Sequence, residues 1–596
     1  MSKNYLIVIL LILITDSWSC EEYLDKIEAS DLTEKDVFGT YIDFQGFEDQ
    51  LYDCVIAYMN HANNCSYNYG DHVIANASGM PTSFWDKGDY WQWYNNTTKT
   101  IFHEAQNDGT FTGIWDSSWK GIRIANICIE KINLLTDATT EQRNFLLGQA
   151  YFFRGFLHWE IIRAFGGMPY IDRLLGPNDE LRIPRLNYQQ STEKIVEDLD
   201  RAIDLLPADW DQTTTGSAYY GYTRGRATKG AALAVKCKAL LFAASPLMNQ
   251  ESNGTGFVYN HELLEQAAEA AHQFFKLVDN GVYYLEPIET YSDNFYKLDG
   301  TTPWGPEVIW ERTMVYDKWG YQGFKNQGIG RLFCGSRLGI VQNCETPTQN
   351  IVDLFEMING LPIGDLDSGY DPKNPWANRD PRFDKAILTD GTKWVKKLPE
   401  SDPTAYIQLF VNGLDKGSQA SLTGYMVKKF WPYGINTIDA NYGNFWFNCP
   451  ILRVADIYLM YAEAVNEVWG PKGAPDFNGE AGITALQAVN IVRARAGMPE
   501  VNAKFTDDEN LFRERIRIER GVELCFEGHR WHDIRRWHVA HLPEYKALYG
   551  CDFDKDHTYF NKVWLMDRVF DEKHYWLPLP KDQVTLYKEC QQNPGW

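Results

Sequence analysis

The apolar residues of the stretch "EQRNFLLGQAYFFRGFLHWEIIRAFGGMP" (residues 141–169) recur at intervals of three and four positions. This period places them on one face of an α-helix, so the pattern predicts a long helix with one buried stripe. Two glycines, Gly166 and Gly167, followed by Pro169, predict its end. The predicted stripe consists of Leu146, Ala150, Phe153, Leu157, Ile161 and Phe165.

A second helix is predicted in "TKGAALAVKCKALLFAASP" (residues 228–246), with Thr228 as its N-cap and Pro246 at its end. Its many alanines let neighbouring helices approach closely, which favours stacked helical hairpins. Further helices are predicted near residues 31–61, 115–135, 192–206, 261–280, 452–469, 481–496 and 508–538. The sequence shows no repeat of fixed period, although paired helices of this kind form solenoids whose repeat has faded.

The pattern changes between about residues 282 and 449, where Gly, Pro, Asn and Asp interrupt every short apolar run. A loop region of this length is usually functional. We therefore predict a predominantly α-helical scaffold that carries a long loop-rich elaboration with little regular structure. The scaffold is expected at about 31–281 and 450–540, the loop-rich ligand surface at 282–449 and a C-terminal tail at 541–596.

The N-terminus has the pattern of a secretory signal. Lys3 precedes the apolar run at residues 5–14, which is too short to span a bilayer, and Cys20 follows closely. Signal removal before Cys20 leaves an N-terminal cysteine for acylation, so we predict that residues 1–19 are a lipoprotein signal peptide and that Cys20 is lipidated. Ser17 and Trp18 depart from the usual residues at those positions, and the alternative is ordinary secretion.

Charge and cysteines limit the possible partners and bonds. The 596-residue chain has a formal net charge of -23, so nucleic acid is not expected as a partner. Cysteines in predicted helices are expected to be buried free thiols: Cys128, Cys237 and Cys525. Two short disulfide loops are possible, with the connectivity open: Cys54 with Cys65, and Cys334 with Cys344.

The stretch "ELCFEGHRWHDIRRWH" (residues 523–538) concentrates the side chains of an acid–base or metal site. His529 and His532 have helical i, i+3 spacing, but the HExxH pattern of a zinc site is absent, so we expect no metal and no cofactor. The chain also lacks a GxSxG nucleophile elbow and a recognisable catalytic cysteine. Paired carboxylates of a glycoside hydrolase stay possible, because their separation is invisible in sequence.

Aromatic residues favour a binding role. The segment "DYWQWYNN" (residues 89–96) lacks a clear helical period, and flat rings stack on sugar rings while amides bond hydroxyls. We predict ligand contacts from Trp91, Trp93, Tyr94 and Asn95. Trp319 and Tyr321 in the glycine-rich stretch 319–328 form a second, weaker candidate. The alternative is that these rings fill a small core under the loops.

Segments spread in a fixed order from Cys20 to the terminal "QNPGW" form a recognisable series. They include "LTEKDVFGTY", "IWDSSWKGIRIANICIEKI", "GQAYFFRGFLHWEIIRAFGGMPYID", "RATKGAALAVKCKALLFAASP", "TPTQNIVDLFEMINGLPI", "NRDPRF", "LRVADIYLMYAEAVNE", "ALQAVNIVRARAG", "RIRIERGVELCFEGHRWHDIRRW" and "YWLPLPKDQV". In this combination they resemble the SusD/RagB-type outer-membrane nutrient-uptake lipoproteins of Bacteroidetes. The resemblance covers essentially all of residues 20–596, which it makes one SusD-like domain.

The resemblance implies a scaffold of four tetratricopeptide-like helix pairs and a non-enzymatic role. Such a protein is anchored by lipid to the outer membrane, is exposed at the cell surface, and passes captured glycans to a SusC-like TonB-dependent transporter. Two alternatives are kept, a peptide-capturing RagB-like protein and a secreted glycoside hydrolase. The shared segments build the scaffold and carry no ligand residues, so the aromatic candidates remain local predictions. The charged stretch 523–538 is then expected to continue one scaffold helix, with Ile518, Val522, Phe526 and Trp531 facing the core.

Overall fold

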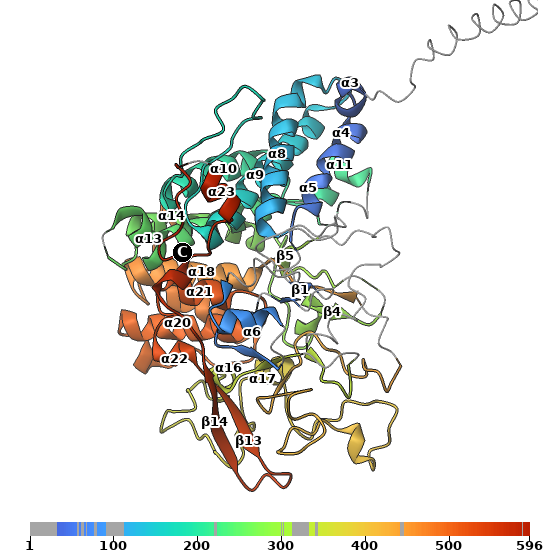
Figure 1. Ribbon diagram of the computed structural model, residues 1–596, viewed down its shortest axis with the longest axis vertical. Helices are drawn as coiled ribbons and strands as arrows, with labels where there is room; N and C mark the ends of the chain where they lie inside the picture. The colour runs from blue at the N-terminus through green and yellow to red at the C-terminus, as the bar shows by residue number, and fades with distance from the viewer. Residues whose placement is uncertain are drawn as a thin grey trace, which may run out of the picture.

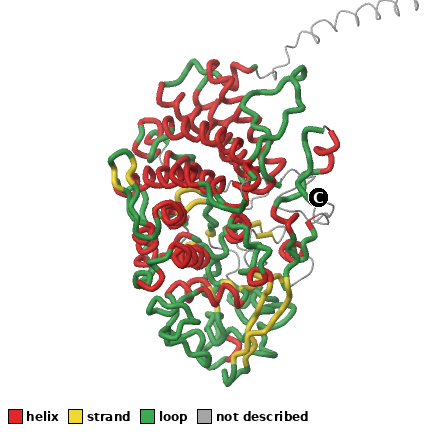
Figure 2. Tube along the Cα trace, turned by 90° about the vertical axis from the view of Figure 1, so that its left-hand side faces the viewer, coloured by secondary structure: helices red, strands yellow, loops and turns green. Residues whose placement is uncertain are grey.

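Long helices pack one after another through half of the molecule (Figures 1 and 2). The computed structural model describes residues 33–56, 59–60, 65–66, 68–76, 80–90, 113–219, 223, 225–254, 256–299, 301, 303–312, 333–339, 344–440, 446–586 and 588–596. The long helices are α8 (Ile114–Lys131), α9 (Thr140–Phe165), α10 (Tyr188–Leu205), α12 (Lys229–Ala244), α14 (His261–Asp279), α18 (Val454–Trp469), α19 (Ala485–Arg495) and α20 (Glu509–Glu523). Each packs on the next as far as α18, which contacts both α19 and α20. This arrangement confirms the predominantly α, tetratricopeptide-like fold class.

Helix α9 has the predicted stripe and the predicted end. A capping box between Thr139 and Gln142 begins the helix, and Gly166 ends it with φ 82°. All six residues of the predicted stripe are buried. Phe152 and Trp159, which lie outside the stripe, are buried as well. The reason is that α8 and α10 both pack against α9, so more than one of its faces is covered.

Helix α12 lies between α10 and α14. The Thr228 hydroxyl accepts a hydrogen bond from the amide of Ala231 at 3.1 Å, which confirms the predicted N-cap. Pro246 ends this helix and begins the next one, α13 (Pro246–Asn253). Within the described residues no single helix is long and apolar enough to span a membrane. Helices α12 and α13 taken together have the length and apolar composition of a membrane span, but the pair is bent by 65°.

Two predicted helices are wrong as single elements. The region 31–61 contains three short helices, because Thr40 caps a new helix just after the first one ends. These are α3 (Glu34–Phe38), α4 (Tyr41–Glu48) and α5 (Gln50–Asp53). The region 508–538 is also broken: α20 stops at Glu523, and α21 (Arg530–Arg536) follows a turn in which Phe526 and Gly528 have φ of 64° and 81°.

The other helix predictions hold with shifted starts, since local caps decide where each helix begins. Asn187 caps α10 four residues before the predicted start at 192, and Thr484 caps α19 after the predicted start at 481. The short helices of the described chain are α6 (Pro81–Asp86), α11 (Thr214–Ser217), α16 (Gln349–Leu354), α17 (Pro381–Ala386), α22 (Pro543–Lys546) and α23 (Lys581–Leu586). The 3-10 turns are η1 (Ile132–Leu134), η2 (Trp210–Gln212), η3 (Tyr291–Asn294), η4 (Pro403–Ala405), η5 (Ala503–Phe505) and η6 (Glu572–Tyr575).

Strands occur only as antiparallel pairs in the described part of the chain. The pairs are β1 (Met59–Asn60) with β2 (Cys65–Ser66), β3 (Val73–Ala75) with β6 (Glu345–Pro347), β4 (Tyr296–Lys297) with β9 (Trp446–Phe447), β5 (Val308–Trp310) with β10 (Leu452–Arg453), β7 (Ile387–Leu388) with β8 (Met426–Val427), β11 (Asp476–Phe477) with β12 (Glu480–Ala481), and β13 (Ala547–Phe553) with β14 (Phe560–Asp567). The last pair forms a long hairpin that points away from the helices (Figure 1). Several pairs join residues more than a hundred positions apart, so they fasten the loop-rich region to the scaffold.

The described residues form two hydrophobic cores, one in the scaffold and one in the loop-rich region. One is formed mainly by the long helices, and the other by residues of the loop-rich region between Tyr291 and Phe447. Val522, Cys525 and Phe526 belong to the second core, although they end or follow α20. The turn after α20 therefore inserts apolar side chains of the charged stretch into the loop-rich region.

Free thiols in the described part of the chain include Cys54, Cys334, Cys344, Cys449, Cys551 and Cys590 as well as the three cysteines predicted to be buried. Cys128, Cys237 and Cys525 are buried, as predicted, and burial raises the pKa of each. Neither proposed disulfide loop is formed, because Cys54, Cys334 and Cys344 are all free. Cys344 instead donates to the carbonyl of Ala420 at 3.2 Å, which holds its thiol in a separate polar contact.

Candidate ligand-binding site

The residues predicted from sequence to contact a ligand lie outside the described residues. They are Trp91, Trp93, Tyr94, Asn95, Trp319 and Tyr321, and the predicted lipidation site Cys20 lies outside as well. Their roles therefore remain predictions. The described residues next to them, from Tyr90 and Gly113 on one segment and from Arg312 and Phe333 on the other, establish how these segments are attached.

Four stacked rings lie at the start of the segment "DYWQWYNN" (residues 89–96), which we call the first aromatic segment. Tyr69 stacks on Trp85 with ring centroids 4.4 Å apart, Trp85 on Tyr90 at 4.3 Å, and Tyr90 on Trp596 at 5.6 Å. We call these four residues the aromatic column. Trp531 of α21 meets Trp85 edge to face at 4.7 Å. The first residue of "DYWQWYNN" with a described ring, Tyr90, is thus a buried core residue rather than a ligand contact.

The short helix α6 positions Trp85 in the column, and C-terminal residues hold α6. Asp86 accepts a hydrogen bond from Nε of Arg568 at 3.0 Å, and the amide of Val569 donates to the Asp86 carbonyl at 2.8 Å. Burial raises the pKa of Asp86 to about 6, although Arg568 opposes this. Gly88 turns the chain with φ 67° close to the His574 ring, where any side chain on it would clash.

The far end of the same segment leads into α8, which packs on the end of α9. Trp115, at the start of α8, meets Phe165 edge to face at 5.1 Å. The Phe165 carbonyl accepts a hydrogen bond from Nδ2 of Asn593 at 2.8 Å. Residues 593–596 therefore contact Tyr90 directly, through Trp596, and reach Trp115 only through Phe165. Sequence inspection identified "QNPGW" as a family segment, but nothing in the sequence shows that it contacts residue 90.

The glycine-rich stretch 319–328, which we call the second aromatic segment, lies in the sequence between a residue of the first core and a residue of the second. On its N-terminal side Trp310 is buried among phenylalanines of α9, and its indole donates to the Gly225 carbonyl at 3.2 Å. On its C-terminal side Phe333 lies in the second core, with its ring centroid 6.0 Å from that of Phe430. The segment bearing Trp319 and Tyr321 therefore starts at the scaffold and ends in the loop-rich region.

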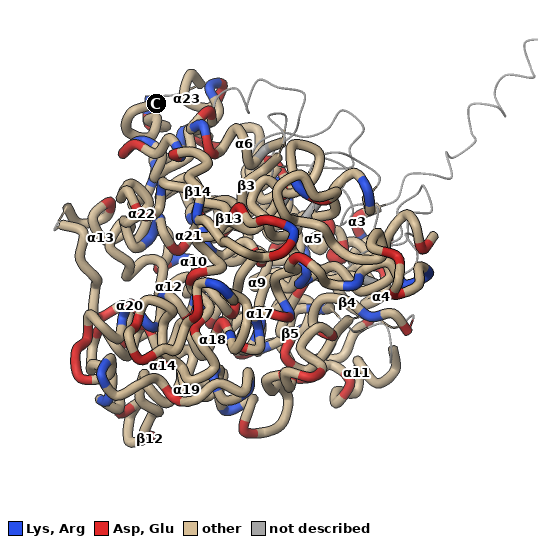
Figure 3. Tube along the Cα trace, turned by 90° about the horizontal axis from the view of Figure 1, so that it is seen from below, with Lys and Arg blue, Asp and Glu red and all other residues tan. Residues whose placement is uncertain are grey.

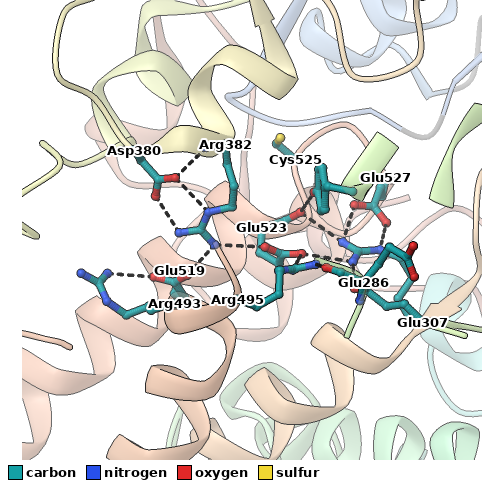
Figure 4. A network of polar contacts seen from close by, with 12 residues as sticks. Glu286, Glu307, Asp380, Arg382, Arg493, Arg495, Glu519, Glu523, Cys525 and Glu527 are labelled. Atoms are coloured by element: carbon teal, nitrogen blue, oxygen red, sulfur yellow. Dashed lines mark hydrogen bonds and ion pairs between the residues drawn. The ribbon is translucent and has the colours of Figure 1, made fainter. Parts of the chain in front are cut away.

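Buried ion pairs lie between the cores (Figure 4). Arg382 contacts Glu519 at 2.6 Å and Glu523 at 3.0 Å, while Arg453 contacts Glu523 at 3.1 Å and Glu527 at 2.7 Å. We call the following set the charge network: Glu307, Asp380, Arg382, Lys429, Arg453, Arg493, Arg495, Glu519, Glu523 and Glu527. Residues of both signs meet around α17 and α18 (Figure 3).

The network keeps the Glu523 carboxylate charged. Burial by itself raises the pKa of Glu523, but Arg495, Arg453 and Arg382 outweigh burial and hold that pKa well below its ordinary value. A carboxylate that is charged at every physiological pH cannot donate a proton as a general acid. Its lone pairs are also occupied by guanidinium donors, so Glu523 does not act as an exposed base.

The histidines of the charged stretch are also held in the interior. Nδ1 of His529 lies 3.4 Å from Nζ of Lys238 and 3.8 Å from Asp456, which are themselves paired at 2.7 Å. Burial, followed by the Lys238 charge, lowers the pKa of His529 well below its ordinary value, so the ring is neutral. The His532 ring is buried as well, and no group of three or more potential ligands for a metal ion occurs in the described part of the chain. Val522, Phe526 and Trp531 face the cores as predicted, so the stretch stabilises the scaffold.

Two family models match most of the chain. One, described as the SusD family, matches residues 306–596, and the other, described as "Starch-binding associating with outer membrane", matches residues 22–241. They correspond to the loop-rich and C-terminal part and to the N-terminal part of the chain.

Similar proteins have comparable lengths. A SusD-like protein of Formosa agariphila is 23% identical over 593 residues, which cover 97% of this chain and 96% of the relative. A solved SusD-like protein of Bacteroides fragilis has a TM-score of 0.69 at 23% identity, with 94% of this chain and 98% of that chain covered. A SusD-like carbohydrate-binding protein of the same species has a TM-score of 0.65 at 19% identity, with 93% and 100% covered. The structural likeness establishes a shared fold over nearly the whole chain.

Proposed function

Because the chain belongs to the SusD family, we propose that it is a lipid-anchored protein of the outer-membrane surface that captures oligosaccharides and passes them to a SusC-like TonB-dependent transporter. The description of the family model that matches residues 22–241 names both starch binding and the outer membrane. The solved relative described as carbohydrate-binding covers 93% of this chain. Cys20 would carry the lipid anchor after removal of residues 1–19.

The observation that carries the proposal is the support under the first aromatic segment. Tyr90, just before the segment, is fixed by the aromatic column, and Trp115, just after it, packs on Phe165, whose carbonyl accepts a bond from Asn593. Side chains on a loop with a rigid base lose less conformational entropy when a ligand binds. We propose that Trp91, Trp93 and Tyr94 stack on sugar rings, that Asn95 bonds hydroxyls, and that Trp319 and Tyr321 add contacts from the second segment.

Capture without catalysis fits the charged residues of the scaffold. The acid–base side chains that most resemble a catalytic cluster are buried in ion pairs and have no access to a substrate. A secreted glycoside hydrolase would need another pair of carboxylates. Capture of peptides, as expected for a RagB-like protein, is the remaining alternative and would use the same aromatic segments.

The central test is ligand retention by the chain without its signal peptide. Purified protein is incubated with a panel of polysaccharides, and both bound polymer and new reducing ends are measured. We expect retention without new reducing ends, and we expect Trp91→Ala with Trp93→Ala to remove the retention that the first aromatic segment provides while the melting temperature stays unchanged.

Matched variants exclude a general effect of losing an aromatic side chain. Trp564, on β14, is 60% exposed and lies far along the sequence from both segments, so Trp564→Ala is the control and should bind normally. Steady release of reducing ends would show an enzyme instead. Retention of peptide pools with no retention of polysaccharide would establish the RagB-like alternative.

A further inference from the structure

Two neighbouring pockets, which we together call the cleft, lie beside α4, η2 and α11, where α5 and α11 are drawn in Figure 1. The pockets have volumes of about 290 and 280 Å³. Trp210, Thr223 and Arg226 line both pockets, so they form the wall between them. Together the pockets reach the size range of small-molecule sites, about 300–1,000 Å³.

Aromatic rings line the whole cleft. Tyr219 borders one pocket with 41% of its surface exposed, and the half-buried Trp304 borders the other. Trp210 stands between them and is fixed by a hydrogen bond from its indole to the Ala227 carbonyl at 2.9 Å. Tyr41 and Tyr283 complete the lining. The exposed part of Tyr219 in one pocket and of Trp304 in the other suits a chain of linked sugar rings better than a single small ligand.

Rigid polar groups accompany these rings. Arg226 Nη1 donates to Asp49 at 2.8 Å and to Gln149 at 3.1 Å, and the Asp49 side chain keeps 45% of its surface exposed. On the other side the Thr223 hydroxyl donates to Asp211 at 2.6 Å. A carboxylate already held in place by its partners loses little freedom when it accepts a further bond from a ligand hydroxyl.

The charges of the cleft select against anions. Asp49, Asp209 and Asp211 line the pockets with Arg226, and Arg226 is already paired with Asp49. A carboxylated or sulfated sugar would lie beside uncompensated negative charge, on a chain whose net charge is -23. A neutral polyol meets no such repulsion and matches the exposed carboxylate oxygens.

We propose that this cleft is a second saccharide-binding site, specific for neutral oligosaccharides and separate from the first aromatic segment. The choice of saccharide as the ligand class rests on the proposed function. The site is built from α4, η2, α11 and residues 282–309, whereas the base of the first aromatic segment is built from α6, α21 and the C-terminal tail. Two sites on one protein would hold a long polysaccharide more tightly than either site alone.

The test separates the two sites by calorimetric titration. The probes are neutral hexasaccharides of glucan, mannan and xylan, with oligogalacturonate as the anionic comparison. We expect wild-type protein to bind at least one neutral hexasaccharide with two sites, and Trp91→Ala with Trp93→Ala to leave one. Added to that double variant, Tyr219→Ala should weaken the remaining site about tenfold, since it removes the most exposed ring of the cleft.

Control variants make the outcomes distinct. Tyr433 is 43% exposed, much like Tyr219, but lies outside the cleft, so Tyr433→Ala should leave both sites unchanged. Trp304→Ala tests the second pocket and should weaken the same site as Tyr219→Ala. If the double variant binds no hexasaccharide while wild type does, the cleft proposal fails and the proposed function stands.

The remaining outcomes also decide between the proposals. Failure of wild type to bind any saccharide in the panel overturns both. Equal or tighter binding of oligogalacturonate to the cleft rejects its specificity for neutral ligands. Loss of transporter association in Tyr219→Ala with unchanged saccharide binding would make the cleft a protein-docking surface and would also reject the proposal.

Discussion

The charge network and the aromatic column both fasten loop segments to the helical scaffold, but they use different interactions. The network joins α19 and α20 to residues of the loop-rich region through guanidinium and carboxylate groups that are almost completely buried. The column joins α6 to α21 and the C-terminus through stacked and edge-to-face rings. The first depends on matched charge and the second on shape.

This difference decides how each region responds to the loss of one member. Desolvating a charge costs several kcal/mol, which only good pairing offsets, so removal of one ion leaves its partners buried and uncompensated. Removal of one ring leaves a cavity and loses contacts, and neighbouring rings relax in part. Loss of one ion of the network should therefore lower the stability of the whole fold. Loss of one ring of the column should affect mainly the segment that the column supports.

The largest effect is expected from Arg453→Met. Arg453 contacts Glu307, Glu523 and Glu527, and its side chain is 1% exposed. The substitution keeps much of the volume but leaves three buried carboxylates without one of their cations, so the free energy of unfolding should fall by about 3–5 kcal/mol at neutral pH. Equilibrium unfolding in urea measures the change.

An exposed ion pair supplies the control for that substitution. Lys472 and Asp507 form a pair whose side chains are 57% and 81% exposed, so Lys472→Met should change stability very little. If Arg453→Met is as stable as wild type, the network does not hold the two cores together. Partly restored stability on replacing Glu527 alone with glutamine in the Arg453→Met protein, which again gives the network equal numbers of cations and carboxylates, would support the account based on uncompensated charge.

Acid should next reveal a buried ion pair that lies outside both regions. Glu463 of α18 accepts bonds from Arg536 and from the Trp537 indole; burial raises its pKa, but Arg536 outweighs burial and lowers the pKa to about 2. A lowered folded-state pKa stabilises the protein above the unfolded value, near 4.5, and this stabilisation is lost as pH falls from there towards 2. The loss for this one group is roughly 3 kcal/mol.

Urea unfolding at a series of pH values from 7 to 2.5 tests this. The stability of Glu463→Gln should be lower than that of wild type at pH 7 and should fall less steeply between pH 4.5 and 2.5. Equal slopes for the two proteins would mean that Glu463 titrates normally. Ring stacking in the column carries no proton, but Asp86, which holds α6 through Arg568, has its pKa raised by burial to about 6, so acid should also act on the column through that contact.

The helices of the scaffold could be predicted from sequence because their causes are local. The period of apolar residues in α9, the Thr228 cap of α12 and the glycines at 166 and 167 act within a few residues of one another. The break after Glu523 was missed, because the apolar period continues through Phe526 although the backbone there turns to positive φ. A pattern of side chains does not reveal such a change of backbone direction.

The site could be predicted only as a kind of chemistry. Sequence inspection identified an aromatic segment next to Tyr90, yet the ring that supports it comes from Trp596, about five hundred positions away. The cleft was not foreseen either, because Trp210, Arg226 and Trp304 stand in three unrelated stretches. Contacts between distant segments depend on how the helices pack, and that packing cannot be inferred from a single sequence.

The smallest effect on stability, and the sharpest on function, is expected from Trp596→Ala. The half-buried ring stacks on Tyr90, and its indole donates to the carbonyls of Lys573 and Trp576, each at 2.9 Å. Truncation removes these contacts at the edge of the fold, so stability should fall by only about 1–2 kcal/mol. Saccharide binding through the first aromatic segment should weaken several-fold, because the base of that segment loses its support.

Comparison with Arg453→Met makes this prediction decisive. The melting temperature and the saccharide affinity of Trp596→Ala, Trp596→Phe and the exposed-ring control Trp564→Ala should be measured together. Trp596→Phe keeps a ring on Tyr90 and should recover most of the affinity, although it loses the indole bonds. If saccharide affinity falls in proportion to stability in all variants, the column acts only through the stability of the whole fold. If saccharide affinity falls in Trp596→Ala alone, the stacked rings position the binding segment, whereas the buried charges hold the scaffold.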